Sequence, residues 1–332
     1  MDSDMPDPGP ATKAVAIVNP TAGGGSRSAA LAKAMGQLGA AGWRLEVCET
    51  EGAGHAGEIA RRAADQGADV AVVVGGDGTV NEVAGALVGS HLALAVLPAG
   101  TGNVLAGQLG LIGVPTPLFR ADLPAAAKKL ARGRVVEVDM GLARTTAGER
   151  HFLLWAGAGF DAEAAFATQQ RHPHLKQALG TAAFGVVAAW TALAAEPVEA
   201  VVSGDDWRLT TTLGLAVAAN VPLYAGTVNI APGAAVDDGL LDVALFPGDR
   251  TAWLLQTAGA VVAASVRSDA RHVRRTTRVL VETATPLRVH VDAEPHGTTP
   301  MQVTTIPRAL RLLVPPSAPD WLFVDGPGGA AS

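Results

Sequence analysis

Residues 69–82 read Asp69-Val70-Ala71-Val72-Val73-Val74-Gly75-Gly76-Asp77-Gly78-Thr79-Val80-Asn81-Glu82. The apolar run predicts a buried strand, the small residues predict a loop, and a helix is expected to begin at Thr79. Glycines in that loop let backbone N–H groups approach a phosphate where a Cβ would block them. Asp77 stands inside the loop, and a carboxylate there repels phosphate unless it holds a cation or orients a donor. These residues therefore predict a nucleotide site that carries chemistry.

The composition is that of a globular protein large enough for two domains. Of the 332 residues, 48% are apolar and 17% charged, which excludes a disordered chain. The net charge of -6 and the aromatic share of 4% argue against a nucleic-acid partner. A single cysteine, Cys48, excludes a disulfide framework and indicates a reducing, cytoplasmic compartment.

Two segments raise questions of targeting. Residues 1–13 carry Asp and Pro without the basic start and apolar core of a signal peptide, so a flexible tail is expected. Gln177–Ala195 has no charged residue and is long enough to raise a transmembrane question. Because Ala, Gly and Thr dominate it, we expect a buried helix of a soluble protein, and a membrane-facing role for one side stays open.

The pattern of apolar runs divides the chain into two domains. Residues 14–133 alternate expected strands (Ala14–Asn19, Arg44–Glu49, Asp69–Gly75, Leu92–Leu97) with expected helices (Ser28–Ala40, His55–Gln66, Thr79–Val88, Thr101–Leu109). This βαβ alternation predicts a parallel sheet covered on both faces. Pro115–Pro117 and a helix Leu123–Ala131 would lead to the second domain.

The second domain, residues 134–315, is expected to be antiparallel and β-rich, with a tail at 316–332. Its expected strands are Val135–Leu142, Val198–Ser203, Trp207–Thr212, Leu215–Ala219, Leu241–Phe246, Arg278–Glu282, Leu287–Val291 and Met301–Ile306. Helical inserts are expected at Leu175–Ala195 and Ala252–Val266.

Three glycine-containing loops follow consecutive expected strands: Asn19–Gly25, Gly75–Thr79 and Pro98–Asn103. Ligands bind at that edge of an open parallel sheet, and glycines there suit anions. One such loop alone is typical of turn chemistry, whereas three on one edge predict a site. None is a Walker or dinucleotide motif, so backbone amides, hydroxyls and a cation would carry the phosphate charge. Thr79 and Glu82 also match a capping box, which leaves a purely structural role open for both.

Together these motifs resemble one known family. Asn19-Pro-Thr-Ala-Gly23, Gly75–Glu82 and Pro98–Asn103 resemble the diacylglycerol kinase and sphingosine kinase superfamily of lipid kinases. Asn220–Gly226, Ala231-Pro232, Asp237–Asp242 and Val291–Pro295 follow in the family's order, so the resemblance spans residues 14–314. The Gly-Gly-Asp-Gly-Thr core also occurs in NAD kinases and phosphofructokinases. Only the full series of motifs, in this order along the chain, is specific to the lipid-kinase family.

The resemblance implies a Rossmann-like, phosphofructokinase- and NAD-kinase-like N-terminal α/β domain, a β-rich, sandwich-like second domain, and ATP in the cleft between them. The residues it places around ATP are Asn19, Pro20, Thr21, Ala22, Gly23, Thr50, Gly75, Gly76, Asp77, Gly78, Thr79, Val80, Asn81, Glu82, Gly100, Thr101 and Asn103.

The resemblance also implies the catalytic residues. Asp77 would reach a catalytic Mg²⁺ through water. Glu294 matches the general base that takes the proton of a lipid hydroxyl, and Asp292 would position it or share the metal network. From the residues alone, Asp292 and Glu294 stand two apart at the end of a Val-rich strand, so both are expected on one face, where they could be merely solvated.

Two further acidic candidates rest on the resemblance. Ala235–Leu240 resembles a structural Mg²⁺ site built from the Asp238 carboxylate and the backbone oxygens of Ala235 and Leu240. The alternative is an Asp-Asp-Gly turn that binds nothing. Asp161, in Gly159-Phe160-Asp161, resembles an acidic residue that sphingoid-base kinases place near the substrate head group.

The chain departs from the family pattern at two positions. Val104 stands where many diacylglycerol kinases have Asp, and the following Leu105-Ala106 resembles the sphingoid-base branch. Ala293 stands where the family's Asp-Gly-Glu has glycine, and its methyl group strains the backbone if φ is positive.

The expected function is that of an ATP- and Mg²⁺-dependent lipid kinase, peripherally bound to the inner face of the cell membrane, that converts diacylglycerol to phosphatidic acid. A sphingoid base or related lipid is the alternative acceptor; an NAD kinase and a weakly active nucleotide- or lipid-binding regulator are further alternatives, and a homodimer stays open. One basic cluster would dock an anionic bilayer or form a solvated face paired with acids. Its members are Arg267, Arg271, His272, Arg274, Arg275 and Arg278.

Overall fold

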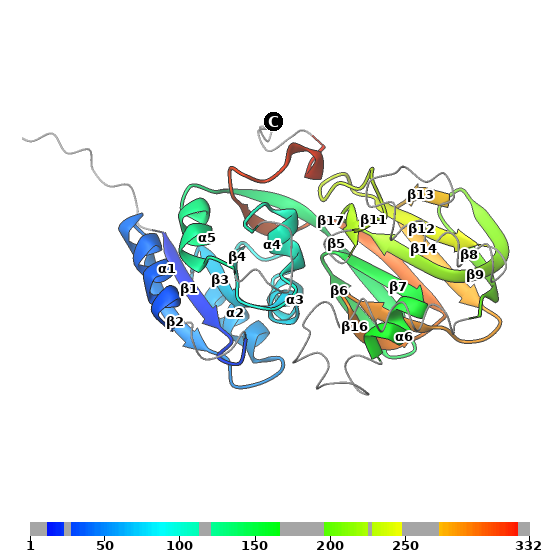
Figure 1. Ribbon diagram of the computed structural model, residues 1–332, viewed down its shortest axis with the longest axis horizontal. Helices are drawn as coiled ribbons and strands as arrows, with labels where there is room; N and C mark the ends of the chain where they lie inside the picture. The colour runs from blue at the N-terminus through cyan, green and yellow to red at the C-terminus, as the bar shows by residue number, and fades with distance from the viewer. Residues whose placement is uncertain are drawn as a thin grey trace, which may run out of the picture.

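The computed structural model describes residues 12–22, 28–112, 121–166, 196–224, 228–247 and 272–324 (Figure 1). The expected helices 175–195 and 252–266, the linker 115–117 and Gly23 lie outside the described residues. Within the described ranges, no helix is both long and apolar enough to span a membrane.

The N-terminal half is the expected parallel sheet with helices packed on it. The strands β1 (Lys13–Val18), β2 (Arg44–Glu49), β3 (Val70–Gly75) and β4 (Ala93–Pro98) pair in the order β4-β3-β1-β2. The helices are α1 (Ser28–Ala40), α2 (His55–Asp65), α3 (Asp77–Ala86), α4 (Val104–Gln108) and α5 (Leu123–Leu130). All six positions of β3 are buried, as expected for a strand between two helical layers.

The helix predicted from Thr101 starts only at Val104. The side chain of Asn103 accepts a hydrogen bond from Gly100 N (2.8 Å) and donates one to Gly100 O (2.8 Å). Because this reciprocal pair closes a turn over residues 100–103, the helix begins after it.

The second half is the expected β-rich unit. Its strands are β5 (Arg134–Thr145), β6 (Gly148–Phe152), β7 (Trp155–Gly159), β8 (Val198–Ser203), β9 (Arg208–Ala219), β10 (Leu223–Tyr224), β11 (Val228–Asn229), β12 (Leu241–Pro247), β13 (His272–Thr276), β14 (Arg278–Thr283), β15 (Arg288–Val291), β16 (Glu294–Thr298) and β17 (Met301–Val314), with helix α6 (Phe160–Phe166) and a 3-10 turn at Asp320–Leu322. The two strands expected within 207–219 form one strand, β9. Strands β6, β7, β10, β11, β13 and β16 are additional. Of these, β7 is Trp-Ala-Gly-Ala-Gly, a composition with little β-propensity.

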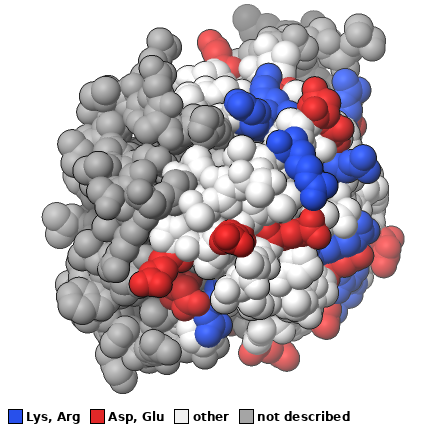
Figure 2. Space-filling model, turned by 90° about the vertical axis from the view of Figure 1, so that its right-hand side faces the viewer, with Lys and Arg blue, Asp and Glu red and all other residues white. Residues whose placement is uncertain are grey.

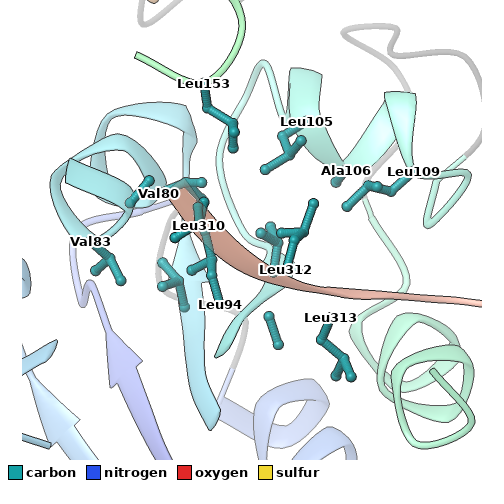
Figure 3. Close-up of a cluster of buried hydrophobic side chains, with 14 of the residues drawn as sticks. Val80, Val83, Leu94, Leu105, Ala106, Leu109, Leu153, Leu310, Leu312 and Leu313 are labelled. Atoms are coloured by element: carbon teal, nitrogen blue, oxygen red, sulfur yellow. The ribbon is translucent and has the colours of Figure 1, made fainter. Parts of the chain in front are cut away.

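A long antiparallel pair, β5 with β17, joins the two halves. β17 runs from the β-rich half back to the N-terminal half, where Leu312 pairs with Leu94 of β4, so one sheet continues through both (Figure 1). Figure 3 shows Leu310 and Leu312 of β17 packed among Leu94, Val80 of α3 and Leu105 of α4. This buried packing holds the loops after β3 and β4 against the start of the second half.

Candidate active site

The loops after β1 and β3 are joined by hydrogen bonds at Asn19. Asn19 Nδ2 donates to Thr79 Oγ1 (3.0 Å), and Asn19 Oδ1 accepts from Thr21 N (3.0 Å) and Thr21 Oγ1 (2.8 Å). Pro20 and Ala22 lie in the same turn, which is closed by a hydrogen bond from Ala22 N to Asn19 O (3.2 Å). Thr50 is buried and directly follows β2, and its backbone N–H donates a hydrogen bond to Val18 O (2.8 Å). The predicted residues of these strand ends therefore share one edge of the sheet.

The loops after β3 and β4 touch through two glycines. A Cβ built on Gly100 would lie 2.4 Å from Gly76 Cα, and one built on Gly75 would lie 2.8 Å from Thr79 Cβ. Ala99 N and Gly100 N both donate to Gly75 O, at 2.8 and 3.1 Å. Glycine is therefore required here by loop-to-loop contact as well as by any approach to phosphate. Thr101 lies exposed next to this contact.

The capping-box interpretation of Thr79 and Glu82 is wrong. Helix α3 begins at Asp77 with extended Gly76 as its N-cap, and no side chain caps it. Thr79 lies within the first turn, where its hydroxyl accepts the hydrogen bond from Asn19. Glu82 lies further along α3 and is half-buried.

Asp77 reaches across to the next loop. Its Oδ1 accepts a hydrogen bond from Val104 N (2.7 Å), the first residue of α4, whose own N-cap Asn103 makes no side-chain cap. A Cβ on Gly102 would lie 2.5 Å from Asp77 Oδ2. Burial raises the pKa of Asp77, and the N–H groups at the start of α4 act against that rise.

Asp292 is anchored by the backbone that precedes β7. Its carboxylate accepts hydrogen bonds from Leu153 N (2.9 Å), Leu154 N (3.1 Å) and Trp155 N (2.9 Å). Burial raises the pKa of Asp292 to about 6, the three N–H groups lower it, and the negative charge of Asp77 raises it.

The two aspartates line one small cavity with Asn81. Its other walls are apolar, formed by Val80, Leu105, Leu153 and Leu154. Asn81 is 7% exposed, and its Oδ1 has no hydrogen-bond partner among the described residues. Two carboxylates and an unpaired amide oxygen are the oxygen donors that Mg²⁺ prefers, so these residues fit a magnesium ion.

Glu294 meets the glycine loop from the other half of the molecule. A Cβ built on Gly78 would lie 2.8 Å from Glu294 Oε1. The second oxygen, Oε2, forms an ion pair with Arg150 Nη2 of β6. No sequence motif marks Arg150, and β6 itself was not predicted, so sequence reasoning missed this residue.

Asp292 and Glu294 do not alternate along one strand as expected. Asp292 (φ 46°) and Ala293 (φ 64°) are both left-handed and form the turn between β15 and β16. The turn sends the Asp292 carboxylate to the backbone of residues 153–155 and the Glu294 carboxylate to Gly78 and Arg150. Ala293 N donates to His290 Nδ1 (3.3 Å), which braces the turn.

In the expected second metal site, the carboxylate of Asp238 is hydrogen-bonded and ion-paired, and its binding of Mg²⁺ stays a prediction. Asp238 Oδ1 accepts from Leu240 N (2.9 Å), and Asp238 Oδ2 pairs with the guanidinium of Arg275, which also contacts Asp242 Oδ2 (3.3 Å). Ala235 is buried beside this loop. In the structure, Arg275 supplies the positive charge next to the Asp238 carboxylate.

Asp161 is not open to a substrate head group. It is 2% exposed, and its carboxylate accepts from Ala162 N (2.7 Å) and Tyr224 OH (2.7 Å) and contacts His290 Nε2 (2.8 Å). Burial and the neighbouring Asp161 hold the pKa of Tyr224 well above its usual value. Asp161 therefore belongs to a buried hydrogen-bonded cluster.

Of the described members of the basic cluster, two are paired with acids. Arg275 contacts Asp238 and Asp242, and Arg278 Nε lies 3.4 Å from Asp205 Oδ1. Figure 2 shows acidic and basic side chains interspersed on the end of the β-rich half. Arg267 and Arg271 lie outside the described residues. These pairs favour the solvated-face alternative for the described part.

Comparison with known proteins identifies the family. Residues 13–143 match the diacylglycerol kinase catalytic domain, and residues 155–314 match the YegS C-terminal NAD kinase beta sandwich-like domain. A diacylglycerol kinase of Mycobacterium tuberculosis (strain H37Rv) is 30% identical over 91% of this chain and 95% of that protein. A Pseudomonas putida protein described as "Probable lipid kinase YegS-like" is 32% identical over 86% of this chain and 90% of its own length.

The fold agrees with these sequence relatives. A crystal structure of a "putative diacylglycerol kinase" from Bacillus anthracis superposes with a TM-score of 0.75 at 25% identity, covering 92% of this chain and 98% of that one. The predicted resemblance and the two-part fold class are confirmed. This chain belongs to the family of diacylglycerol kinases and YegS-like lipid kinases, and it is a lipid kinase.

Proposed function

We propose that this lipid kinase transfers the γ-phosphoryl group of ATP, with Mg²⁺, to the free hydroxyl of diacylglycerol and releases phosphatidic acid. The observation that carries the proposal is the approach of Glu294 Oε1 to Gly78, which puts a carboxylate at the glycine loop. Diacylglycerol as the acceptor is supported by the M. tuberculosis relative, whose name states that substrate.

Each group of site residues has a distinct role in this reaction. The backbone of Gly76–Gly78 and the polar groups of Asn19 and Thr79 face the triphosphate. Asp77, Asp292 and Asn81 would hold Mg²⁺, which neutralises phosphate charge when bound. Glu294 accepts the proton of the attacking hydroxyl. The hydroxyl oxygen bonds to the γ-phosphorus while the bond from that phosphorus to the bridging oxygen of ADP breaks.

Diacylglycerol is favoured over a sphingoid base because the expected recognition acid is not accessible. Asp161, the candidate for an amino head group, is 2% exposed and hydrogen-bonded to Tyr224. A neutral acceptor needs no such acid. Because this acceptor lies in a bilayer, we also propose that the enzyme works bound to the inner face of the membrane.

A lipid panel tests the function. The wild-type protein is incubated with labelled ATP, Mg²⁺ and vesicles that contain diacylglycerol, a sphingoid base or neither, and NAD is offered in a separate reaction. We expect label in phosphatidic acid alone. Label in the sphingoid base or in NAD would refute the proposed acceptor, and ATP binding without any transfer would identify a regulator.

The base assignment is tested with Glu294→Gln. This variant should lose transfer by about 100-fold or more while it still binds ATP. Full turnover by Glu294→Gln would show that another group takes the proton.

A further inference from the structure

Arg150 is the cation that the structure brings to the carboxylate of Glu294. It lies on β6, opposite Ala143 of β5, and its Nη2 pairs with Glu294 Oε2. The side chains of Arg150 and Glu294 are 29% and 38% exposed, so the pair is partly screened from water. Among the ion pairs of the described residues, this is the one that involves Asp77, Asp292 or Glu294.

The guanidinium lies next to the phosphate loop. Glu294 contacts Arg150 through Oε2 while its other oxygen reaches the position of a Gly78 Cβ at 2.8 Å. One carboxylate therefore separates Arg150 from the first turn of α3. Burial lowers the pKa of His296 on β16, and the positive charge of Arg150 lowers it further.

A nucleotide bound at the glycines would be repelled by the nearby carboxylates, and backbone N–H groups alone do not neutralise that charge. Asp77 and Asp292 line one cavity and Glu294 lies against Gly78, so three acidic groups gather near the glycines, and the three loops contain no lysine at a Walker position. A guanidinium binds two phosphate oxygens through its planar fork and stabilises the charge on the equatorial oxygens during transfer. A terminal phosphate also carries more negative charge than one carboxylate, so it competes well for Arg150.

We propose that Arg150 is a catalytic residue whose guanidinium binds the γ-phosphate of ATP, in competition with its pair to Glu294. This inference rests on the proposed ATP site. When Arg150 bonds to the γ-phosphate, Glu294 Oε2 is released to take the hydroxyl proton. Through Arg150, the binding of ATP thereby frees the carboxylate of Glu294 to act as the base. The hydroxyl oxygen bonds to phosphorus, ADP leaves with the electron pair of the broken bond, and Arg150 stays on the transferred group.

Equilibrium binding of ATP and ADP separates this role from a structural one. Isothermal titration calorimetry with Mg²⁺ is run on the full chain as wild type, Arg150→Gln and Arg150→Lys. We expect Arg150→Gln to weaken ATP binding about 10- to 100-fold and ADP binding less than about threefold, since ADP has no γ-phosphate. Arg150→Lys keeps the charge and should recover part of the ATP affinity.

Two further variants sharpen the test. Arg144→Gln removes an exposed ion pair with Glu149 (2.7 Å) on the same hairpin and should leave the ATP-to-ADP affinity ratio unchanged. Glu294→Gln removes the competitor and should tighten ATP binding in the wild-type background but not in Arg150→Gln.

The outcomes distinguish the two proposals. An equal loss of ATP and ADP affinity in Arg150→Gln, or no loss, overturns the role of Arg150. A wild-type protein that binds neither nucleotide overturns the proposed function itself. Thermal unfolding of each variant shows whether the chain is folded, and Arg150→Lys serves if Arg150→Gln is not.

Discussion

Asp77 and Asp292 come from opposite halves of the molecule and face the same small cavity. Each is held by backbone N–H groups of a neighbouring segment in its own half: Val104 N for Asp77, and the N–H groups of residues 153–155 for Asp292. The cavity walls are apolar, so the negative charge of Asp77 is weakly screened and adds to the rise that burial causes in the pKa of Asp292.

Stability should therefore fall as pH rises through the pKa of Asp292. The folded-state pKa of about 6 lies above the ordinary 3.8, so the folded protein binds this proton more tightly than the unfolded chain. The stabilising contribution is fully present below pH 3.8 and is lost as pH rises through about 6, by about 3 kcal/mol. Urea unfolding from pH 4 to 7.5, without nucleotide or Mg²⁺, measures it. Asp292→Ala should flatten this pH dependence; an unchanged slope in the variant would contradict the assignment.

Replacing Ala293 with glycine should stabilise the protein. Ala293 has a φ of 64°, a left-handed conformation that costs an alanine about 1–2 kcal/mol and a glycine almost nothing. After the entropy of an unfolded glycine is subtracted, a gain of about 0.5–1 kcal/mol is expected, measured by urea unfolding. Ala125→Gly, at an exposed position of α5, is the matched control and should destabilise. A loss of stability in both variants would argue against strain at residue 293.

Gly100→Ala should damage the site, because the new Cβ would lie 2.4 Å from Gly76 Cα and neither backbone has room to move freely. We expect a destabilisation of about 1–3 kcal/mol and weaker ATP binding. Gly36→Ala in α1, where nothing lies within 4 Å, should instead stabilise by about 0.5–1 kcal/mol. Thermal unfolding and calorimetry of both variants check this, and equal behaviour of the two would refute the close contact.

His290 should act as a positioning residue for the catalytic turn. Its Nδ1 accepts the N–H of Ala293 (3.3 Å), while its Nε2 contacts Asp161 Oδ2 (2.8 Å). His290→Ala should lower kcat by about 10- to 100-fold through misplacement of Glu294 and leave the KM for ATP nearly unchanged. Tyr224→Phe, which removes one donor to Asp161 but keeps the link from His290 to Ala293, should cost much less. A rise in KM with kcat intact would show that the turn needs no such brace.

The strands of the N-terminal half could be predicted because their cause is local. β3 is a continuous run of buried apolar residues, and the glycine loop that follows it ends the strand in any context. Strands β6, β7 and β16 were missed since polar, alanine- and glycine-rich segments become strands only through pairing with β5, β9 and β15. The capping box was wrong because α3 begins two residues earlier, at Asp77 after the extended Gly76, which puts Thr79 inside the first turn, where its hydroxyl accepts a hydrogen bond from Asn19.

The sequence by itself determined the family, through the order of its motifs. It also determined the two-part architecture and the edge of the sheet that carries the glycine loops, because the periodicity of apolar residues indicates which element forms and which face is buried. The tertiary structure alone decided which charges meet. Glu294 reaches Gly78 and Arg150, Asp292 reaches the cavity of Asp77, and Arg275 takes the carboxylate expected to bind a metal. These contacts depend on the register of β5 with β17 and of β7 with β15 and on the left-handed turn at residues 292–293. These contacts cannot be read from a local pattern, because the identity of a charged residue does not indicate which distant residue becomes its partner in the folded protein.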